Sequence, residues 1–497
     1  MPLPLFAHAR DHAGRIAVVA PEGVFTYRDL LEASGSAANR LLAGRDDLQE
    51  ARVCFLVPPG WDYVAVQWAI WRSGGVAVPL ATSHPPAELA YVLDDAAPEV
   101  VVAHPSLRGR IAAVAAERRL EVIPTDELIE EGPVASAPEL TASRRAMILY
   151  TSGTTGRPKG VVTTHGNNEA QVRSLVKAWG WTRDDHILLT LPLHHVHGIV
   201  NVLACALWSG AVCQILARFE PAETWERIAR GDLTLYMAVP TLYGRLIAAW
   251  EAADAPTRER WSAAARRLRL MVSGSAALPV PTLERWEEIT GQRLLERYGM
   301  TEIGMGISNP LLGDRRPGYV GQPLPGVEVR LVDESGAPVA DGASGQIEVR
   351  GPGVFSEYWR RPEATAEAFT PDGWFRTGDR AVLADGSYRI LGRESVDILK
   401  TGGEKVSALE IEDELRGHPA VADCAVVGVP DQDWGERVCA AVVAHPGTAP
   451  RPEELRAFVK ERLAPYKVPK EVLVVPDLPR NAMGKVTKPD VKKLFGG

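Results

Sequence analysis

Residues 150–167 read YTSGTTGRPKGVVTTHGN, and the rest of the chain is organised around this stretch. It follows RRAMILY, a short apolar run that predicts a buried strand. Glycines let a backbone approach a ligand closely, and such a loop offers N–H groups, hydroxyl donors and a cation. That chemistry suits a polyphosphate. The candidate ligands are Thr151, Ser152, Gly153, Thr154, Thr155, Gly156 and Lys159.

The order of residues in this stretch is not that of the P-loop, GxxxxGK[ST], and no helix is expected directly behind Lys159. A surface loop of small residues is the alternative. The stretch resembles the phosphate-binding signature of the adenylate-forming superfamily, which includes acyl-CoA synthetases, adenylation domains of peptide synthetases and firefly luciferase. The resemblance implies that the loop holds the phosphates of ATP.

Length and composition favour an enzyme of at least two domains. The 497 residues, 46% of them hydrophobic, exceed the size at which a single core usually divides. The formal charge of -8 and the lack of a long basic block argue against nucleic-acid binding. The five cysteines have no CxxC spacing, which predicts neither disulfides nor a zinc site. Without a signal peptide pattern or a long apolar segment, we expect a cytoplasmic protein that does not bind membranes.

Strands and helices alternate along the first half of the chain. Residues 25–42 predict a helix that Thr26 caps, and residues 51–60 predict a buried strand. Residues 63–80 predict a helix stopped by glycines and a second strand. This alternation indicates a mixed α/β body with at least one largely parallel sheet.

The superfamily resemblance extends this fold prediction over essentially the whole chain. It implies a large N-terminal α/β body of several subdomains, residues 1–392, with parallel-rich sheets and a small β-barrel-like part. A small, mobile α+β domain, residues 393–497, is implied to follow.

Two further motifs resemble the nucleotide site of the superfamily. LRLMVSGSAALP, residues 268–279, predicts a strand, a glycine turn and a helix start, and LLERYGMTEIG covers residues 294–304. The resemblance implies that Gly274, Ser275 and Ala276 contact adenine, and that Tyr298, Gly299 and Met300 line the same site. Thr301 is implied to contact the α-phosphate and Glu302 to bind Mg²⁺, a hard cation that accepts carboxylates and nucleotide phosphates.

The segment GWFRTGDRAVLADGSYRILGR, residues 373–393, predicts a hairpin on the Asp-Gly turn. Asp379 is an acceptor suited to the ribose hydroxyls, and the resemblance adds Arg393 to the ATP contacts. Near the C-terminus, PRNAMGKVTK resembles the motif of the catalytic lysine, which implies that Lys485 bridges the attacking carboxylate and the α-phosphate. A lysine so placed is otherwise simply solvated.

LPLHHVHGIVN, residues 191–201, brings three histidines together at a strand-to-helix junction. A metal site is one interpretation, but the usual carboxylate or cysteine companions are missing. The resemblance instead implies that His197 lines the acyl pocket, which leaves His194 and His195 with a structural role.

The acid to be activated is predicted from Arg297, which precedes Tyr298. A buried guanidinium is costly without a partner, so it favours a substrate with a second carboxylate. His197 and Ser275 would donate further hydrogen bonds, and Met305 completes the acyl set. The alternative is an ion pair of Arg297 with Glu296 or another acidic residue. Several motifs resemble malonyl-CoA synthetases, including the mitochondrial type that also accepts methylmalonate.

The resemblance also implies a path for CoA. In the superfamily the C-terminal domain rotates between the two half-reactions and presents the loop that is LKTGGEKVSALE here, residues 399–410. The residues expected to line the CoA tunnel are Lys400, Gly402, Gly403 and Trp434. The usual hinge residue is Asp or Lys, but this chain has Ser395 there, with Asp397 nearby.

These features predict an AMP-forming ligase whose substrates are ATP with Mg²⁺, CoA and a small dicarboxylic acid, acting as a monomer or homodimer. The carboxylate attacks the α-phosphorus, and a thiol then takes the acyl group. The alternatives are a ligase for another short acid, an adenylation enzyme that loads a carrier protein, a luciferase-like oxidase and a non-catalytic binding protein.

Overall fold

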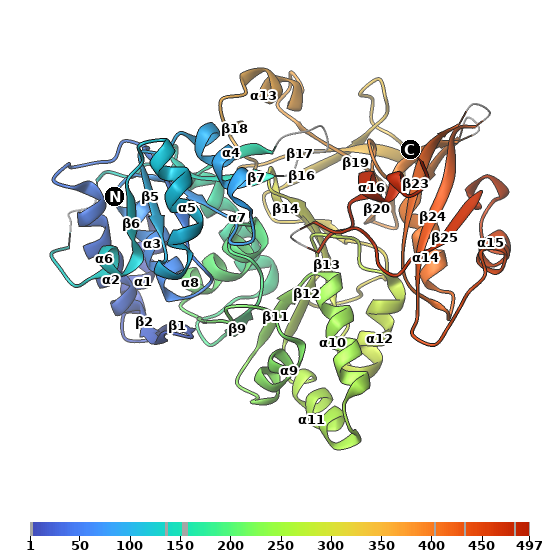
Figure 1. Cartoon of the computed structure of the whole chain (residues 1–497), viewed down its shortest axis with the longest axis horizontal. Helices are drawn as coiled ribbons and strands as arrows, with labels where there is room; N and C mark the ends of the chain where they lie inside the picture. The colour runs from blue at the N-terminus through green and yellow to red at the C-terminus, as the bar shows by residue number, and fades with distance from the viewer. Residues whose placement is uncertain are drawn as a thin grey trace.

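The computed structural model describes residues 3–134, 138–151, 158–401, 404–431, 434–481 and 484–496. Within these ranges the strands form four sheets. Figure 1 shows the N-terminal elements at one end of the molecule and the C-terminal sheet at the other. No helix of the described ranges is long and apolar enough to cross a membrane.

The first sheet is parallel at its centre. Its strand order is β15-β14-β13-β12-β11-β9-β10-β1-β2, and the six strands from β13 to β1 run parallel. The strands are β1 (Ile16–Ala20), β2 (Gly23–Thr26), β9 (His186–Leu189), β10 (Val212–Ile215), β11 (Leu235–Ala238), β12 (Leu270–Ser273), β13 (Leu295–Met300), β14 (Gly304–Ser308) and β15 (Gln322–Pro323).

The second sheet carries the phosphate-loop strands at one side. Its order is β18-β8-β7-β4-β3-β5-β6, parallel from β7 to β6. The strands are β3 (Arg52–Leu56), β4 (Val76–Pro79), β5 (Val100–Ala103), β6 (Val122–Pro124), β7 (Arg145–Thr151), β8 (Lys159–Thr164) and β18 (Glu357–Tyr358). The two sheets confirm the prediction of a largely parallel α/β body.

Helices cover these sheets and fill the space between them. They are α1 (Pro4–Asp11), α2 (Tyr27–Leu42), α3 (Trp61–Arg72), α4 (Pro86–Ala96), α5 (Pro105–Glu117), α6 (Thr125–Ile129), α7 (His165–Trp179), η1 (His197–Ala204), α8 (Cys205–Ser209), α9 (Pro221–Ala229), α10 (Pro240–Ala252), α11 (Ala255–Ala265), α12 (Val280–Thr290) and α13 (Pro362–Ala368). The Thr26 cap of α2 is confirmed, since its hydroxyl accepts from Asp29 N and Asp29 accepts from Thr26 N.

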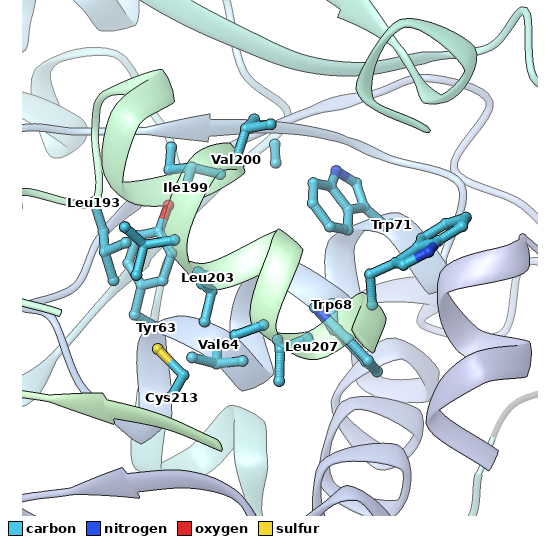
Figure 2. Close-up of a cluster of buried hydrophobic side chains, with 14 of the residues drawn as sticks. Tyr63, Val64, Trp68, Trp71, Leu193, Ile199, Val200, Leu203, Leu207 and Cys213 are labelled. Atoms are coloured by element: carbon cyan, nitrogen blue, oxygen red, sulfur yellow. The ribbon is translucent and has the colours of Figure 1, made fainter. Parts of the chain in front are cut away.

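One apolar core joins the two parallel sheets through the helices between them. It includes Phe55 of β3 and Leu189 of β9, one strand from each sheet. Figure 2 shows α3 meeting η1 and α8 there, with Trp68 near Leu207 and Tyr63 near Leu193. Fully burying one aliphatic side chain of this kind contributes about 1.5 to 3 kcal/mol. The packing therefore fixes η1, which carries His197, against the body of the protein.

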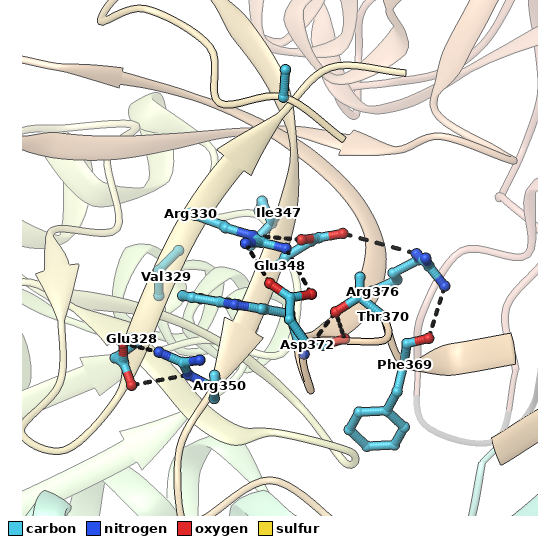
Figure 3. A network of polar contacts seen from close by, with 12 residues as sticks. Glu328, Val329, Arg330, Ile347, Glu348, Arg350, Phe369, Thr370, Asp372 and Arg376 are labelled. Atoms are coloured by element: carbon cyan, nitrogen blue, oxygen red, sulfur yellow. Dashed lines mark hydrogen bonds and ion pairs between the residues drawn. The ribbon is translucent and has the colours of Figure 1, made fainter. Parts of the chain in front are cut away.

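The third sheet is antiparallel and corresponds to the small part that was expected to be barrel-like. Its order is β16 (Glu328–Val332), β17 (Ser344–Arg350), β19 (Phe375–Ala384) and β20 (Ser387–Arg393). Figure 3 shows the charged side chains on one face, where Glu348 Oε2 accepts from Arg330 Nε at 2.7 Å. The predicted Asp-Gly hairpin joins β19 to β20, with φ of 51° at Asp385 and 73° at Gly386.

The C-terminal sheet, orange to red in Figure 1, forms an α+β unit together with its helices. It contains β21 (Ile398–Thr401), β22 (Glu404–Ser407), β23 (Val421–Asp431), β24 (Gly435–Ala444) and β25 (Glu471–Val474), with α14 (Ala408–Arg416), α15 (Pro452–Lys460), η2 (Pro465–Lys467) and α16 (Lys488–Lys493). The strand β20 ends at Arg393, and residues 394–397 form the turn that leads to β21. The domain boundary at residue 393 stays a prediction.

The five cysteines are distributed over the sheets and helices of the body and the C-terminal sheet. They are Cys54, Cys205, Cys213, Cys424 and Cys439, and all are free and buried. Burial raises the pKa of each thiol above its ordinary value. These thiols are therefore poor nucleophiles at neutral pH.

Candidate active site

The two ends of the phosphate loop lie side by side. Thr151 ends β7 and Lys159 begins β8, and the two residues are partners in an antiparallel ladder. As expected, no helix opens directly behind Lys159, where the strand β8 runs to Thr164. The candidates Ser152, Gly153, Thr154, Thr155 and Gly156 lie outside the described residues.

Lys159 and Glu302, the next site residue, both contact Tyr358. Lys159 Nζ lies 5.0 Å from the centre of the Tyr358 ring, and the Tyr358 hydroxyl donates to Glu302 Oε1 at 3.0 Å. Glu302 follows β13 in the turn before β14 and is buried, which raises its pKa. Half-buried Thr301 precedes it in the same turn. A buried carboxylate of this kind suits Mg²⁺ shared with nucleotide phosphates. Among the described residues, no group of three or more His, Cys, Asp or Glu is placed to hold a metal.

Tyr298, Asp379 and Arg393 form a hydrogen-bonded group. The Tyr298 hydroxyl donates to Asp379 Oδ2 at 2.6 Å, and Arg393 Nε donates to Oδ1 at 3.1 Å. Asp379 and Arg393 are directly opposed on β19 and β20. Each carboxylate oxygen has two lone pairs, so Asp379 can still accept from ribose hydroxyls. Burial and the Asp379 carboxylate raise the pKa of Tyr298.

The turn after β12 is strained at Ser275, whose φ is 70°. Gly274 is buried and the next residue, Ala276, is exposed. A Cβ on Gly274 would lie 2.5 Å from Arg297 Cζ, so a larger residue here would displace the guanidinium. Gly299 and Met300, at the end of β13, are partly buried near Tyr298.

The acyl candidates His197, Ser275 and Arg297 are brought together by three different elements. Ser275 Oγ lies 3.1 Å from His197 Nδ1 and accepts from Arg297 Nη2 at 3.3 Å. The other nitrogens, His197 Nε2 and Arg297 Nε and Nη1, are buried and have no hydrogen-bond partner among the described residues. Burial lowers the pKa of Arg297 to about 9 and that of His197 well below its usual value. Met305 is buried on β14 and lies opposite Gly299.

The predicted alternative for Arg297, an ion pair with Glu296 or another acidic residue, is wrong for the described part of the chain, where burial is the one cause of its lowered pKa. Successive residues of a strand point to opposite faces, so Glu296 and Arg297 diverge on β13. The Glu296 carboxyl faces the backbone N–H groups of Leu278 and Gly318, and burial raises its pKa to about 8. It is mainly neutral at pH 7.

Lys485 lies near Arg297 and Arg393 although it is far from them in sequence. Burial, reinforced by the charges of Arg297 and Arg393, lowers its pKa to about 8. The positive charge of Lys485 in turn contributes to the lowered pKa of His195 and of His197. The turn that carries it has Gly484 at φ 75°, and Lys485 N donates to Asn481 Oδ1 at 3.0 Å. The role of Lys485 between the carboxylate and the α-phosphate stays a prediction.

The remaining candidates lie around the C-terminal sheet. Lys400, on β21, is exposed, and its backbone N–H donates to Glu436 Oε2 at 2.8 Å. Trp434 is 38% exposed, with Lys470 Nζ 4.0 Å from its ring centre. Gly402 and Gly403 lie outside the described residues, and Ser395 is exposed in the turn before β21.

The rings of His194 and His195 pack against each other at a tilt of 50°, with their centroids 4.2 Å apart. Burial lowers the pKa of His194 to about 4 and that of His195 well below its ordinary value. Both rings are therefore neutral at pH 7, and their predicted structural role stays a prediction.

Two polar residues, Asn201 and Tyr358, were not predicted as part of the site. Asn201 lies on η1 one turn after His197, and neither atom of its side-chain amide has a hydrogen-bond partner within the described ranges. Tyr358 reaches Glu302 from β18, on the other sheet. Asn201 could have been predicted from the sequence, because a residue four positions after His197 lies on the same face of a helix. No local sequence pattern indicates that Tyr358 contacts Glu302.

Comparison with known proteins places the chain in a family. The family described as AMP-binding enzyme matches residues 5–359. The chain belongs to this family. A second match, AMP-binding enzyme C-terminal domain, covers residues 410–485. The predicted membership of the adenylate-forming superfamily is thereby confirmed.

Individual relatives of this AMP-binding enzyme resemble it over nearly its full length. The mitochondrial malonate–CoA ligase ACSF3 of Xenopus laevis is 47% identical, over 98% of this chain and 91% of that protein. ATP-bound MatB from Rhodopseudomonas palustris is 37% identical with a TM-score of 0.92, covering 100% and 99% of the two chains. A malonyl-CoA ligase complex with methylmalonyl-CoA and AMP is 39% identical with a TM-score of 0.71, covering 96% and 100%.

Proposed function

We propose that this AMP-binding enzyme is an ATP-dependent malonate–CoA ligase. A carboxylate oxygen of malonate attacks the α-phosphorus of ATP and the bond to pyrophosphate breaks, which gives malonyl-AMP. The thiol sulfur of CoA then attacks the acyl carbon, AMP leaves, and the thiol proton is released. The names of the relatives support this reaction.

The observation that carries the choice of acid is the unpaired guanidinium of Arg297. It is buried, retains two nitrogens without a partner in the described ranges, and is turned away from Glu296. The guanidinium loses its water when the protein folds and not when the substrate binds. A substrate carboxylate therefore gains most of the ion-pair energy on binding. A monocarboxylate of the same length would leave the charge unpaired, which is costly.

The residues around the phosphates would catalyse adenylate formation by position and charge. Lys485 places its ammonium between the attacking carboxylate and the α-phosphate, while Asp379 and Tyr298 hold the nucleoside. Glu302, supported by Tyr358, would hold Mg²⁺, which supplies positive charge to the phosphate oxygens. Thr151 and Lys159 would bind the phosphates from the loop ends.

Thioester formation requires the thiol to reach the same acyl carbon. The C-terminal domain, residues 393–497, would turn about Ser395 and bring Lys400 and the loop after it to the site, with Trp434 along the path of CoA. One comparison supports such a movement. The relative bound to methylmalonyl-CoA and AMP has a lower TM-score than the relative bound to ATP, 0.71 against 0.92, at nearly equal identity.

The finer assignments are also proposals. The chain would act in the cytoplasm as a monomer or homodimer, although the vertebrate relative is named mitochondrial. Light scattering of the purified protein would give its mass in solution. Fractionation of the source cells would give its compartment.

The test is pyrophosphate release with ATP, Mg²⁺ and CoA across acetate, propionate, malonate, methylmalonate and succinate. We expect malonate to give the highest kcat/KM, with AMP and malonyl-CoA formed in equal amounts. A parallel reaction replaces CoA with a phosphopantetheinylated carrier protein. Equal rates for propionate and malonate would contradict the role of Arg297, and preference for the carrier would identify a carrier-loading enzyme.

A further inference from the structure

A buried group of three charged side chains lies outside the nucleotide site. Lys488 Nζ, at the start of α16, is 2.7 Å from Asp397 Oδ1 and 2.7 Å from Glu412 Oε1. The three side chains are 11%, 18% and 5% exposed, respectively. Burial alone would lower the pKa of Lys488, but the two carboxylates hold it above its ordinary value. The ammonium group of Lys488 is therefore charged at neutral pH.

Asp397 connects this group to the end of β20. Its Oδ2 accepts from the backbone N–H of Arg393 at 3.0 Å, while its Oδ1 faces Lys488. Its own N–H donates to Arg393 O at 2.7 Å. At Gly392, where φ is 117°, a Cβ would lie 2.4 Å from Asp397 Cβ, so a glycine is needed for this approach. One carboxylate thus joins two segments that are far apart in sequence.

The two segments that Asp397 joins carry two residues of the candidate site. Arg393 donates from its side chain to Asp379, and Lys485 is three residues before Lys488. Lys485 lies near the guanidinium groups of Arg297 and Arg393, which repel it. The carboxylate of Asp379 offsets part of this repulsion. The pairing of Lys488 with Asp397 and Glu412 supplies an attractive contact immediately after the turn that carries Lys485.

Glu412 makes the group rigid from the other side. Its Oε1 also accepts from Val426 N at 2.8 Å, and Arg416 Nη2 lies 3.5 Å from its Oε2. A buried carboxylate with several partners keeps one orientation, since breaking one contact leaves the charge poorly compensated. Lys488 is therefore fixed relative to α14 and β23 as well as to β20.

We propose that Asp397 and Lys488 are positioning residues that hold Lys485 over the acyl and α-phosphate site during adenylate formation. They touch neither substrate, and they act through the backbone of Arg393 and the turn that carries Lys485. This inference rests on the proposed function, because it assigns the effect to one of the two half-reactions.

The experiment measures both half-reactions of purified full-length variants. Malonate-dependent exchange between ATP and pyrophosphate reports adenylation, and CoA consumption with freshly prepared malonyl-AMP reports thioester formation. The variants are Asp397→Asn and Lys488→Met. The matched control is Lys493→Met, because Lys493 makes an exposed ion pair with Asp490 on the same helix, 2.7 Å apart.

We expect both test variants to lower adenylation about 10- to 100-fold, since a displacement of about 1 Å can cost a factor of 100. Thioester formation should stay within about twofold of the parent, as should both activities of the control. Asp397→Asn combined with Lys488→Met should be little worse than Lys488→Met alone. Lys488→Arg, which keeps the charge, should recover part of the adenylation rate.

An equal loss in both half-reactions, or unchanged adenylation in folded variants, would overturn the positioning role. Melting curves identify variants that fail to fold. If Lys488→Met fails to fold, the result for Asp397→Asn decides the question, because this change leaves the side-chain volume almost unchanged. If the unaltered protein itself made no malonyl-AMP, the proposed function would fail first. If the protein activates another acid, the same half-reactions can be measured with that acid, and they test the inference equally well.

Discussion

Replacement of Arg297 by leucine tests the acyl site directly. Arg297 is 3% exposed, and its guanidinium donates to Ser275 and has two further nitrogens without partners in the described ranges. A charge-assisted hydrogen bond contributes about 1.5 to 3 kcal/mol. At about 1.4 kcal/mol per factor of ten, its loss predicts a fall in kcat/KM for malonate of about 10- to 150-fold. Propionate makes no such contact and should be used equally well or better.

The assay is pyrophosphate release at several concentrations of malonate and of propionate. General damage to the site lowers both kcat/KM values by a similar factor, so their ratio reports the contact with the second carboxylate alone. Arg260→Leu is the control, because Arg260 is exposed and paired with Glu226 at the surface. The melting temperature of Arg297→Leu should not fall, since the change removes an unpaired buried charge. An unchanged ratio for malonate over propionate would show that the second carboxylate lies elsewhere.

Three other predictions concern neighbouring residues. Lys485→Met should lower adenylation by more than 100-fold and spare thioester formation from malonyl-AMP; equal losses in both would contradict its role. Tyr358→Phe removes the hydroxyl that donates to Glu302 and should raise the Mg²⁺ concentration for half-maximal rate about tenfold, measured by titration. Glu296 has a folded pKa of about 8, so its protonation favours folding at low pH and this contribution is lost as pH rises toward 8. Glu296→Gln should therefore flatten the fall of the unfolding free energy between pH 5 and pH 8 in urea titrations.

Much of the fold was predictable because its signals are local. The capping box at Thr26, the glycines after α3 and the Asp-Gly turn between β19 and β20 each depend on a few neighbouring residues. The alternation of strands and helices then predicted a parallel sheet. Which strands pair, and that β13 continues the sheet of β1, depends on packing that no short pattern encodes.

The candidate site was predictable only where residues belong to one motif. Tyr298 and Glu302 stand in one short segment, and Lys485 was found through its resemblance to a known motif. Tyr358 could not be predicted as a partner of Glu302, because two sheets must first meet. The pairing of Lys488 with Asp397 is similar, since it joins residues that lie almost a hundred positions apart.

The burial of all five thiols makes the protein suitable for distance measurements by fluorescence. Maleimide dyes react with exposed thiolates, so the native cysteines should remain unlabelled in the folded protein. Cysteines introduced at exposed Leu312 and Glu461 would then carry the only dyes, one on the large body and one beside the C-terminal sheet. Energy transfer between them would follow any rotation of one part against the other, turnover by turnover, in an otherwise unmodified chain.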